Sequence, residues 1–140
     1  MWPIYQGTSC LPNIPGKSTS CTLGGYPNYV INASTVEHIQ LGVKFARENG
    51  LRLVIKNSGH DYLGKSNGAG SLSIWTHRLN DIQYFKDYQS TRYRGAAIKM
   101  GAGLDAEKLY TTAKSVGFTP VSVGGEGHVS HYSPSIVRLH

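Results

Sequence analysis

The stretch KNSGHDYLGKS, residues 56–66, decides how this chain is interpreted. It places glycine, small polar residues and a histidine directly after LRLVI, residues 51–55, a mostly apolar run of strand length. Ligands of parallel sheets bind beyond the carboxyl ends of the strands. We therefore expect the Gly-rich residues 56–70 to form a ligand-binding loop.

The residues before this run predict a strand and a helix. YVI, residues 29–31, is a short β-branched run, and Ser34 and Glu37 have the spacing of a capping box that starts a helix. The expected apolar face recurs at intervals of three, four and three residues, at Val36, Ile39, Val43 and Ala46. Gly50 is placed to end this helix. Residues 29–55 therefore predict a βαβ unit with parallel strand pairing.

The rest of the chain predicts a mixed α+β fold. The expected strands are SLSIW (residues 71–75), RGAAIKM (residues 94–100) and residues 118–123, and the expected second helix is residues 105–116, ended by Gly117. Residues 1–28 have no sustained period and predict an irregular arm. We see no repeat and no domain boundary within residues 29–127, and residues 128–140 read as a divergent tail.

Composition restricts the class of protein. The 140 residues suit one domain, and the net charge of +6 is spread along the chain, which argues against a nucleic-acid partner. No run approaches the ~20 apolar residues of a membrane helix. The opening MWPIYQGTSC lacks the basic segment and apolar run of an export signal.

Two features nevertheless favour an oxidising compartment. Cys10 and Cys21 are the only cysteines, and they flank a polar segment rich in proline and glycine. They are either bridged or two unrelated thiols, and we favour the bridge. Asn32-Ala33-Ser34 matches the acceptor pattern for N-glycosylation at Asn32.

Taken as a string, Gly59–Ser66 (GHDYLGKS) matches the phosphate loop of nucleoside-triphosphate hydrolases. A phosphate loop must be followed at once by a helix whose amino terminus faces the phosphates. Here Asn67-Gly68-Ala69-Gly70 follows, which disfavours a helix. Asp61 would also repel phosphate. We therefore disfavour a nucleotide-phosphate binder.

A second glycine pattern, GAGLDA at residues 101–106, fits the dinucleotide fingerprint GxGxxA, with Glu126 as a candidate ribose acceptor. Asp105 would place a carboxylate where the pyrophosphate belongs. We favour a tight turn between strand and helix with Asp105 as the N-cap.

A flavin site suits the loop better. Asn57, Ser58 and Gly59 allow close approach of a ligand to the backbone, and an exposed imidazole at His60 is a competent nucleophile. Such an imidazole can join a flavin ring methyl carbon covalently. The residues alone leave open whether His60 does this or is a structural histidine.

KNSGHDYLGKS followed by GAGSLSIWTH (residues 68–77) resembles the FAD-linked oxidoreductases of the vanillyl-alcohol-oxidase fold, whose FAD-binding domain is called PCMH-type. Within that fold the similarity is greatest to the fungal berberine-bridge-enzyme-like group. It extends over residues 2–127, and it includes residues 20–40, GAGL (residues 101–104) and VSVGGEG (residues 121–127).

The resemblance implies an amino-terminal βαβ subdomain and part of a second mixed subdomain. It implies that Asn57, Ser58, Gly59, His60 and Asp61 contact the FAD pyrophosphate, that His60 carries the flavin, and that Gly124 and Gly125 lie near it. It also implies a Cys10–Cys21 bridge in a secreted protein. Many members attach FAD a second time through a cysteine where this chain has Gly127, so we expect single attachment.

After Gly127 the chain reads HVSHYSPSIVRLH and departs from the family. We expect an amino-terminal fragment without the substrate domain or the catalytic base. The leading hypothesis is an FAD-dependent oxidoreductase that takes a hydride from a small-molecule alcohol or amine and is reoxidised by dioxygen. The alternative is an inactive remnant that folds partly or only binds ligand. His128 and His131 lack further ligands nearby, so we expect no metal site.

Overall fold

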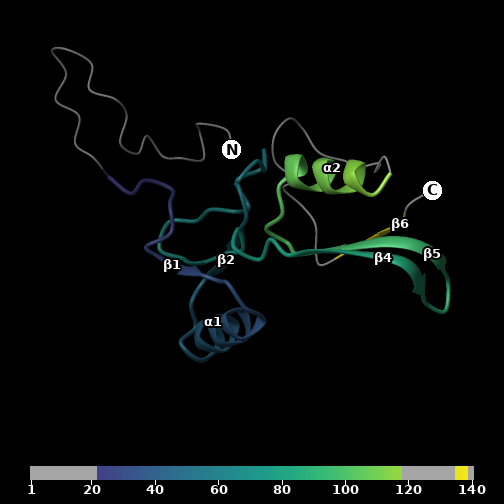
Figure 1. Cartoon of the computed structure of the whole chain (residues 1–140). Coiled ribbons are helices and arrows are strands. Elements are labelled where there is room, and N and C mark those ends of the chain that lie inside the picture. Colours follow the sequence, from purple (N-terminus) through teal and green to yellow (C-terminus); the bar gives the residue numbers. More distant parts are fainter. Residues whose placement is uncertain (1–21, 118–134, 139–140) are drawn as a thin grey trace, which may run out of the picture. The chain divides into compact units, whose positions relative to one another are not determined.

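The computed structural model describes residues 22–117 and the backbone of residues 135–138, and the chain divides into two compact units, Met1–Thr76 and His77–His140 (Figure 1). The described elements of the first unit are β1 (Tyr29–Asn32), α1 (Val36–Glu48), β2 (Leu53–Lys56) and β3 (Leu72–Trp75). Those of the second are β4 (Ile82–Gln89), β5 (Arg94–Met100), α2 (Ala106–Ser115) and β6 (Ser135–Arg138). Both units mix helix and sheet, so the expected α+β class is confirmed.

The first unit contains a parallel sheet in the order β1-β3-β2. Ile74 of β3 is in register with Ile31 of β1 on one side and with Ile55 of β2 on the other. The expected strands are therefore present and parallel, but direct pairing of residues 29–31 with 51–55 is wrong. A third strand lies between them, and it comes from beyond the Gly-rich loop.

Helix α1 packs on this sheet through its smallest residues. Gly42 and Ala46 are its buried positions, and a Cβ at Gly42 would lie 2.7 Å from Ile31 Cδ1. Val36 and Val43 are 62% and 45% exposed, so the expected apolar face is wrong at those two residues. Small residues let the helix approach the isoleucines of the sheet closely.

The ends of α1 are set by residues near those expected. Thr35, not Ser34, is the N-cap, because its hydroxyl accepts a hydrogen bond from the His38 amide at 3.3 Å. The hydroxyl of Ser34 instead lies 3.4 Å from Nδ1 of the His38 ring. At the other end Gly50 has a φ of 61°, the left-handed conformation that ends helices, as expected.

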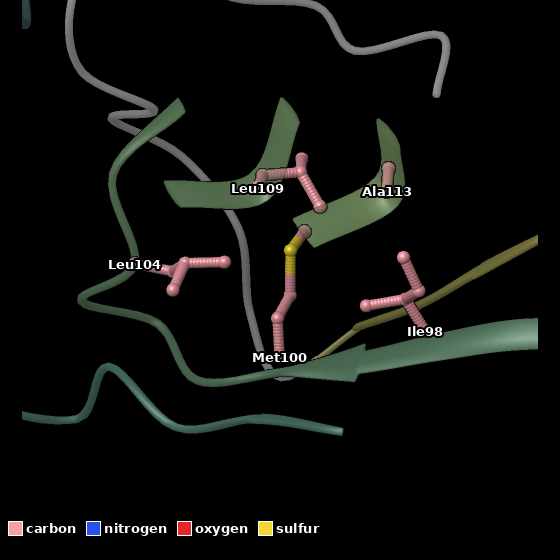
Figure 2. Close-up of a cluster of buried hydrophobic side chains, with 5 residues drawn as sticks. All are labelled: Ile98, Met100, Leu104, Leu109 and Ala113. Carbon is pink, nitrogen blue, oxygen red and sulfur yellow. The ribbon is translucent and has the colours of Figure 1, made fainter. Parts of the chain in front are cut away.

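The second unit contains an antiparallel sheet in the order β4-β5-β6, with α2 packed against it. Met100 extends from β5 toward α2 (Figure 2). The buried cluster consists of Ile98, Met100, Leu104, Leu109 and Ala113. Strand β4 was not expected, and β6 falls within the tail read as divergent. The expected strand at residues 118–123 lies outside the described residues.

Candidate functional site

The start of the loop after β2 is held by hydrogen bonds from residues at the ends of β2 and β3. The main-chain oxygen of Asn57 accepts hydrogen bonds from the Trp75 indole at 2.9 Å and from Lys56 Nζ at 3.4 Å. The amide of Thr76 donates to the Lys56 oxygen at 2.9 Å. The loop therefore begins at the carboxyl ends of parallel strands, where ligands of such sheets bind.

Small residues and an imidazole follow on this loop. The hydroxyl oxygen of Ser58 is buried and has no hydrogen-bond partner within residues 22–117. Gly59 has a φ of 89°, and a Cβ on it would lie 2.9 Å from Lys56 Cε. His60 is exposed, as expected. A buried polar group without a partner is costly, which makes the Ser58 hydroxyl a candidate contact for a polar ligand atom.

The carboxylate of Asp61 binds other residues of the same loop. The carboxylate accepts hydrogen bonds from the amide of Lys65 at 2.8 Å, from the amide of Ser66 at 3.3 Å and from the Ser66 hydroxyl. Desolvation raises the pKa of Asp61, but hydrogen bonds from the Ser66 hydroxyl and from backbone amides outweigh it, so the pKa lies below its ordinary value. Asp61 is therefore a carboxylate at neutral pH.

This arrangement agrees with rejection of the phosphate-loop interpretation. The chain runs from Ser66 through turns to β3 at Leu72, and no helix lies between them. The amides that would face a phosphate in such a loop bind Asp61 instead. Gly59–Ser66 therefore matches the sequence pattern of a phosphate loop but does not have its geometry.

A groove of about 510 Å³ lies on the sheet face opposite α1. Its residues come from all three strands, from the loop and from the segment before β1, and they are Tyr26, Pro27, Val30, Asn32, Lys56, Asn67, Ser73 and Trp75. Lys56 Nζ lies 6.0 Å from the centroid of the Trp75 ring, within cation–π distance. The sequence did not single out Lys56 or Trp75, although both end strands at the same sheet edge.

The GAGLDA turn of the second unit is explained by packing. A Cβ on Gly101 would lie 1.9 Å from the Leu79 oxygen, and the Gly103 amide donates to that oxygen at 2.9 Å. Asp105 is the N-cap residue of α2, as expected, but its side chain makes no capping bond and lies 4.0 Å from His77 Nδ1. Gly101 therefore allows two chain segments to cross closely.

Of the other residues predicted to have a role, only Asn32 lies in the described part of the chain. Asn32 is exposed at the end of β1, where a glycan attachment has access. Cys10, Cys21, Gly124, Gly125, His128 and His131 lie outside the described residues. Within the described part of the chain, no three His, Cys, Asp or Glu side chains gather as metal ligands, and no helix has the length and apolar character to cross a membrane.

Comparison with known proteins decides the family. The model of the FAD-binding domain family matches residues 27–130, which include both glycine turns. The chain belongs to this family. The FAD-binding domain includes all five loop residues, Asn57–Asp61, and the expected vanillyl-alcohol-oxidase fold is confirmed.

Curated relatives agree with this assignment. The chain is 44% identical over 113 residues to the VAO-type flavoprotein oxidase VAO615 of Thermothelomyces thermophilus, covering 81% of this chain and 20% of that protein. It is 45% identical over 126 residues to the FAD-linked oxidoreductase ZEB1 of Gibberella zeae, covering 90% and 22%. The chain thus spans about a fifth of the length of these relatives.

Solved structures agree as well. The VAO-type flavoprotein MtVAO615 of Myceliophthora thermophila superimposes with a TM-score of 0.79 at 43% identity, over 85% of this chain and 22% of that one. MtVAO713 of the same organism gives 0.67 at 38% identity, over 77% and 20%. This FAD-binding domain therefore has the VAO-type fold over most of the chain.

Proposed function

We propose that this chain binds FAD as part of an FAD-dependent oxidoreductase, with the pyrophosphate held by Asn57, Ser58 and Gly59. The observation that carries the proposal is the buried Ser58 hydroxyl without a partner among the described residues. It lies on a loop at the strand ends of an FAD-binding domain. Gly59 lets the side chain of Lys56 lie close to the backbone, since a Cβ there would be 2.9 Å from Lys56 Cε. Asp61 is proposed to contact the pyrophosphate through its backbone only, because its carboxylate accepts hydrogen bonds from the amides of Lys65 and Ser66.

Positive charge beside the loop supports an anionic ligand. Lys56 Nζ lies next to the start of the loop, 3.4 Å from the Asn57 oxygen, and its side chain lines the groove. A cation near a pyrophosphate-binding backbone lowers the energy of the bound anion. Gly124 and Gly125 are proposed to lie near the flavin ring, as the family resemblance implies.

We propose that His60 carries the flavin covalently. Its imidazole is exposed on the loop, directly after the residues proposed to hold the pyrophosphate. In this bond His60 would supply an imidazole nitrogen and FAD the ring methyl carbon, each with loss of one proton. Dioxygen would take up the two electrons and two protons released. Bound FAD supplies the hydride acceptor for a substrate alcohol or amine.

The test uses the full chain expressed with FAD available. Flavin fluorescence that stays with the denatured protein, and a mass increase of one FAD, are expected for the wild type and absent in His60→Ala. His38→Ala is the matched control, because His38 is an exposed histidine on α1 whose ring contacts Ser34 locally. Colourless wild-type protein of unmodified mass contradicts the covalent proposal.

We further propose a secreted protein with a Cys10–Cys21 disulfide and a glycan on Asn32, of the berberine-bridge-enzyme-like group. The exposure of Asn32 supports the glycan. Expression through a eukaryotic secretory pathway tests these features. Both thiols should react with an alkylating reagent only after reduction, and the glycan should disappear in Asn32→Gln. Reaction of both thiols without reduction contradicts the bridge.

A further inference from the structure

The Asp61 carboxylate closes a ring of six residues next to the proposed flavin attachment site. On the basis of the proposed function, we propose that Asp61 is a positioning residue for His60. Its carboxylate binds the amides of Lys65 and Ser66 and the Ser66 hydroxyl, and it thereby holds the backbone that follows His60 in one conformation.

Side-chain packing contributes little to holding residues 62 and 63 of the loop. Tyr62 and Leu63 are 75% and 65% exposed, so their side chains provide almost no packing. Gly64 has a φ of 69°, a conformation that glycine adopts without strain and does not itself enforce. Covalent attachment requires the imidazole to meet one carbon atom, and placement of reacting groups dominates the rate of such steps. The hydrogen bonds of Asp61 supply a restraint on the segment that follows His60.

The other end of the ring is anchored in the first unit. Ser66 and Asn67 are only 8% and 4% exposed, and the Asn67 amide donates to the Gly64 oxygen at 3.2 Å. The next residue, Gly68, is also closely packed, since a Cβ on it would lie 3.1 Å from Cζ of Arg52. Asp61 therefore ties the exposed part of the loop, beside His60, to buried backbone.

The same contacts argue against the Asp61 carboxylate as a ligand for the pyrophosphate or as a base. Oδ1 accepts from the Lys65 amide, and Oδ2 accepts from both donors of Ser66. A carboxylate directed at a pyrophosphate would also be repelled by it. Hydrogen bonds that keep the pKa of Asp61 low make it a poor proton acceptor at neutral pH.

The test compares Asp61→Ala, Asp61→Asn and Ser66→Ala with Asp87→Asn, which removes an exposed carboxylate from β4 in the other unit. Amide hydrogen exchange at Lys65 and Ser66 is measured in the full chain without FAD. The rate of covalent flavin attachment is measured with saturating FAD. Asp61→Ala is expected to accelerate the exchange and to slow the attachment, each about ten-fold, which corresponds to the loss of one or two hydrogen bonds.

The conservative variants separate positioning from folding. Asp61→Asn keeps one carbonyl acceptor and Ser66→Ala removes one donor, so both are expected to fall between Asp61→Ala and the wild type. Asp87→Asn is expected to match the wild type. If Asp61→Ala does not fold, the intermediate rates of these two variants decide the question.

The outcomes distinguish this proposal from the proposed function. A wild-type chain that forms no flavin adduct contradicts the covalent site, while amide exchange still tests the ring. If Asp61→Ala accelerates exchange but attaches flavin at the wild-type rate, Asp61 is structural only and the positioning role is overturned. Unchanged exchange at Lys65 and Ser66 overturns the ring itself.

Discussion

The indole N–H of Trp75 donates a hydrogen bond to the main-chain oxygen of Asn57 at 2.9 Å. This bond joins the last residue of β3 to the first residue of the loop that follows β2. The two residues are far apart in sequence, and they meet because β3 pairs in parallel with β2. The start of the loop is therefore held by the sheet.

Trp75→Phe keeps an aromatic ring but removes this donor. We expect the free energy of unfolding to fall by about 1 kcal/mol and the fraction of flavin-linked chain to fall with it. The control Tyr93→Phe removes a hydroxyl that donates to the Ala96 oxygen at 2.6 Å in the other unit. It should lose similar stability in urea titrations without a change in flavin loading. Equal loading in both variants contradicts the role of Trp75.

Gly59→Ala tests the close approach on the loop. The φ of 89° is expected to cost about 1 kcal/mol, and the added Cβ, 2.9 Å from Lys56 Cε, displaces the lysine side chain, so we expect flavin attachment to be abolished. Gly50→Ala is the matched control, because Gly50 also has a positive φ but open space around it. It should cost about 1 kcal/mol and leave attachment intact. Retained attachment in Gly59→Ala speaks against the loop as a pyrophosphate site.

The stability contributed by Asp61 is expected to depend on pH. Its pKa is lower in the folded chain than the ordinary value near 3.8, so the carboxylate stabilises the fold above that value. The contribution is lost as the pH falls through the lowered folded pKa. In urea titrations the wild type should therefore be more stable than Asp61→Asn at about pH 6, and the difference should shrink below about pH 4. A difference that is the same at both pH values contradicts this assignment.

Gly101→Ala tests whether the GAGLDA turn needs glycine for packing. The added Cβ would overlap the Leu79 oxygen at 1.9 Å, and main-chain atoms cannot rotate away as a side chain can. We expect a loss of about 3 kcal/mol or more in unfolding free energy. Gly117→Ala, at a positive φ with open space, should cost only about 1 kcal/mol. Equal losses in the two variants would show that the crossing is looser than described.

Leu109→Ala tests the core of the second unit. Leu109 is fully buried between α2 and β5, so its truncation should cost about 2–5 kcal/mol in urea titrations. Leu41→Ala removes the same atoms from a residue that is 64% exposed on α1. That variant should lie within about 0.5 kcal/mol of the wild type. A small effect at Leu109 would contradict the packing of α2 on the sheet.

Local sequence patterns predicted the elements that are determined by neighbouring residues in the chain. Strand β5 and the glycine ends of both helices agree with expectation, because φ preferences and local periodicity act over a few residues. Strand β4 was missed, since a register shift between Phe85 and Tyr88 breaks the alternation that marks a strand. The exposed Val36 and Val43 show that periodicity alone does not select which side of a helix meets the sheet.

By itself, the sequence determined the family, since KNSGHDYLGKS and its neighbours carry the resemblance. Only the tertiary structure placed β3 between β1 and β2, because strand pairing joins residues that are distant in the chain. It also decided what Asp61 does. The sequence of residues 59–66 matches a phosphate-loop pattern. In the folded loop, however, the Asp61 carboxylate accepts hydrogen bonds from the amides that a phosphate would need. A carboxylate held close by its own loop binds those amides without the entropy loss of capturing a separate ligand.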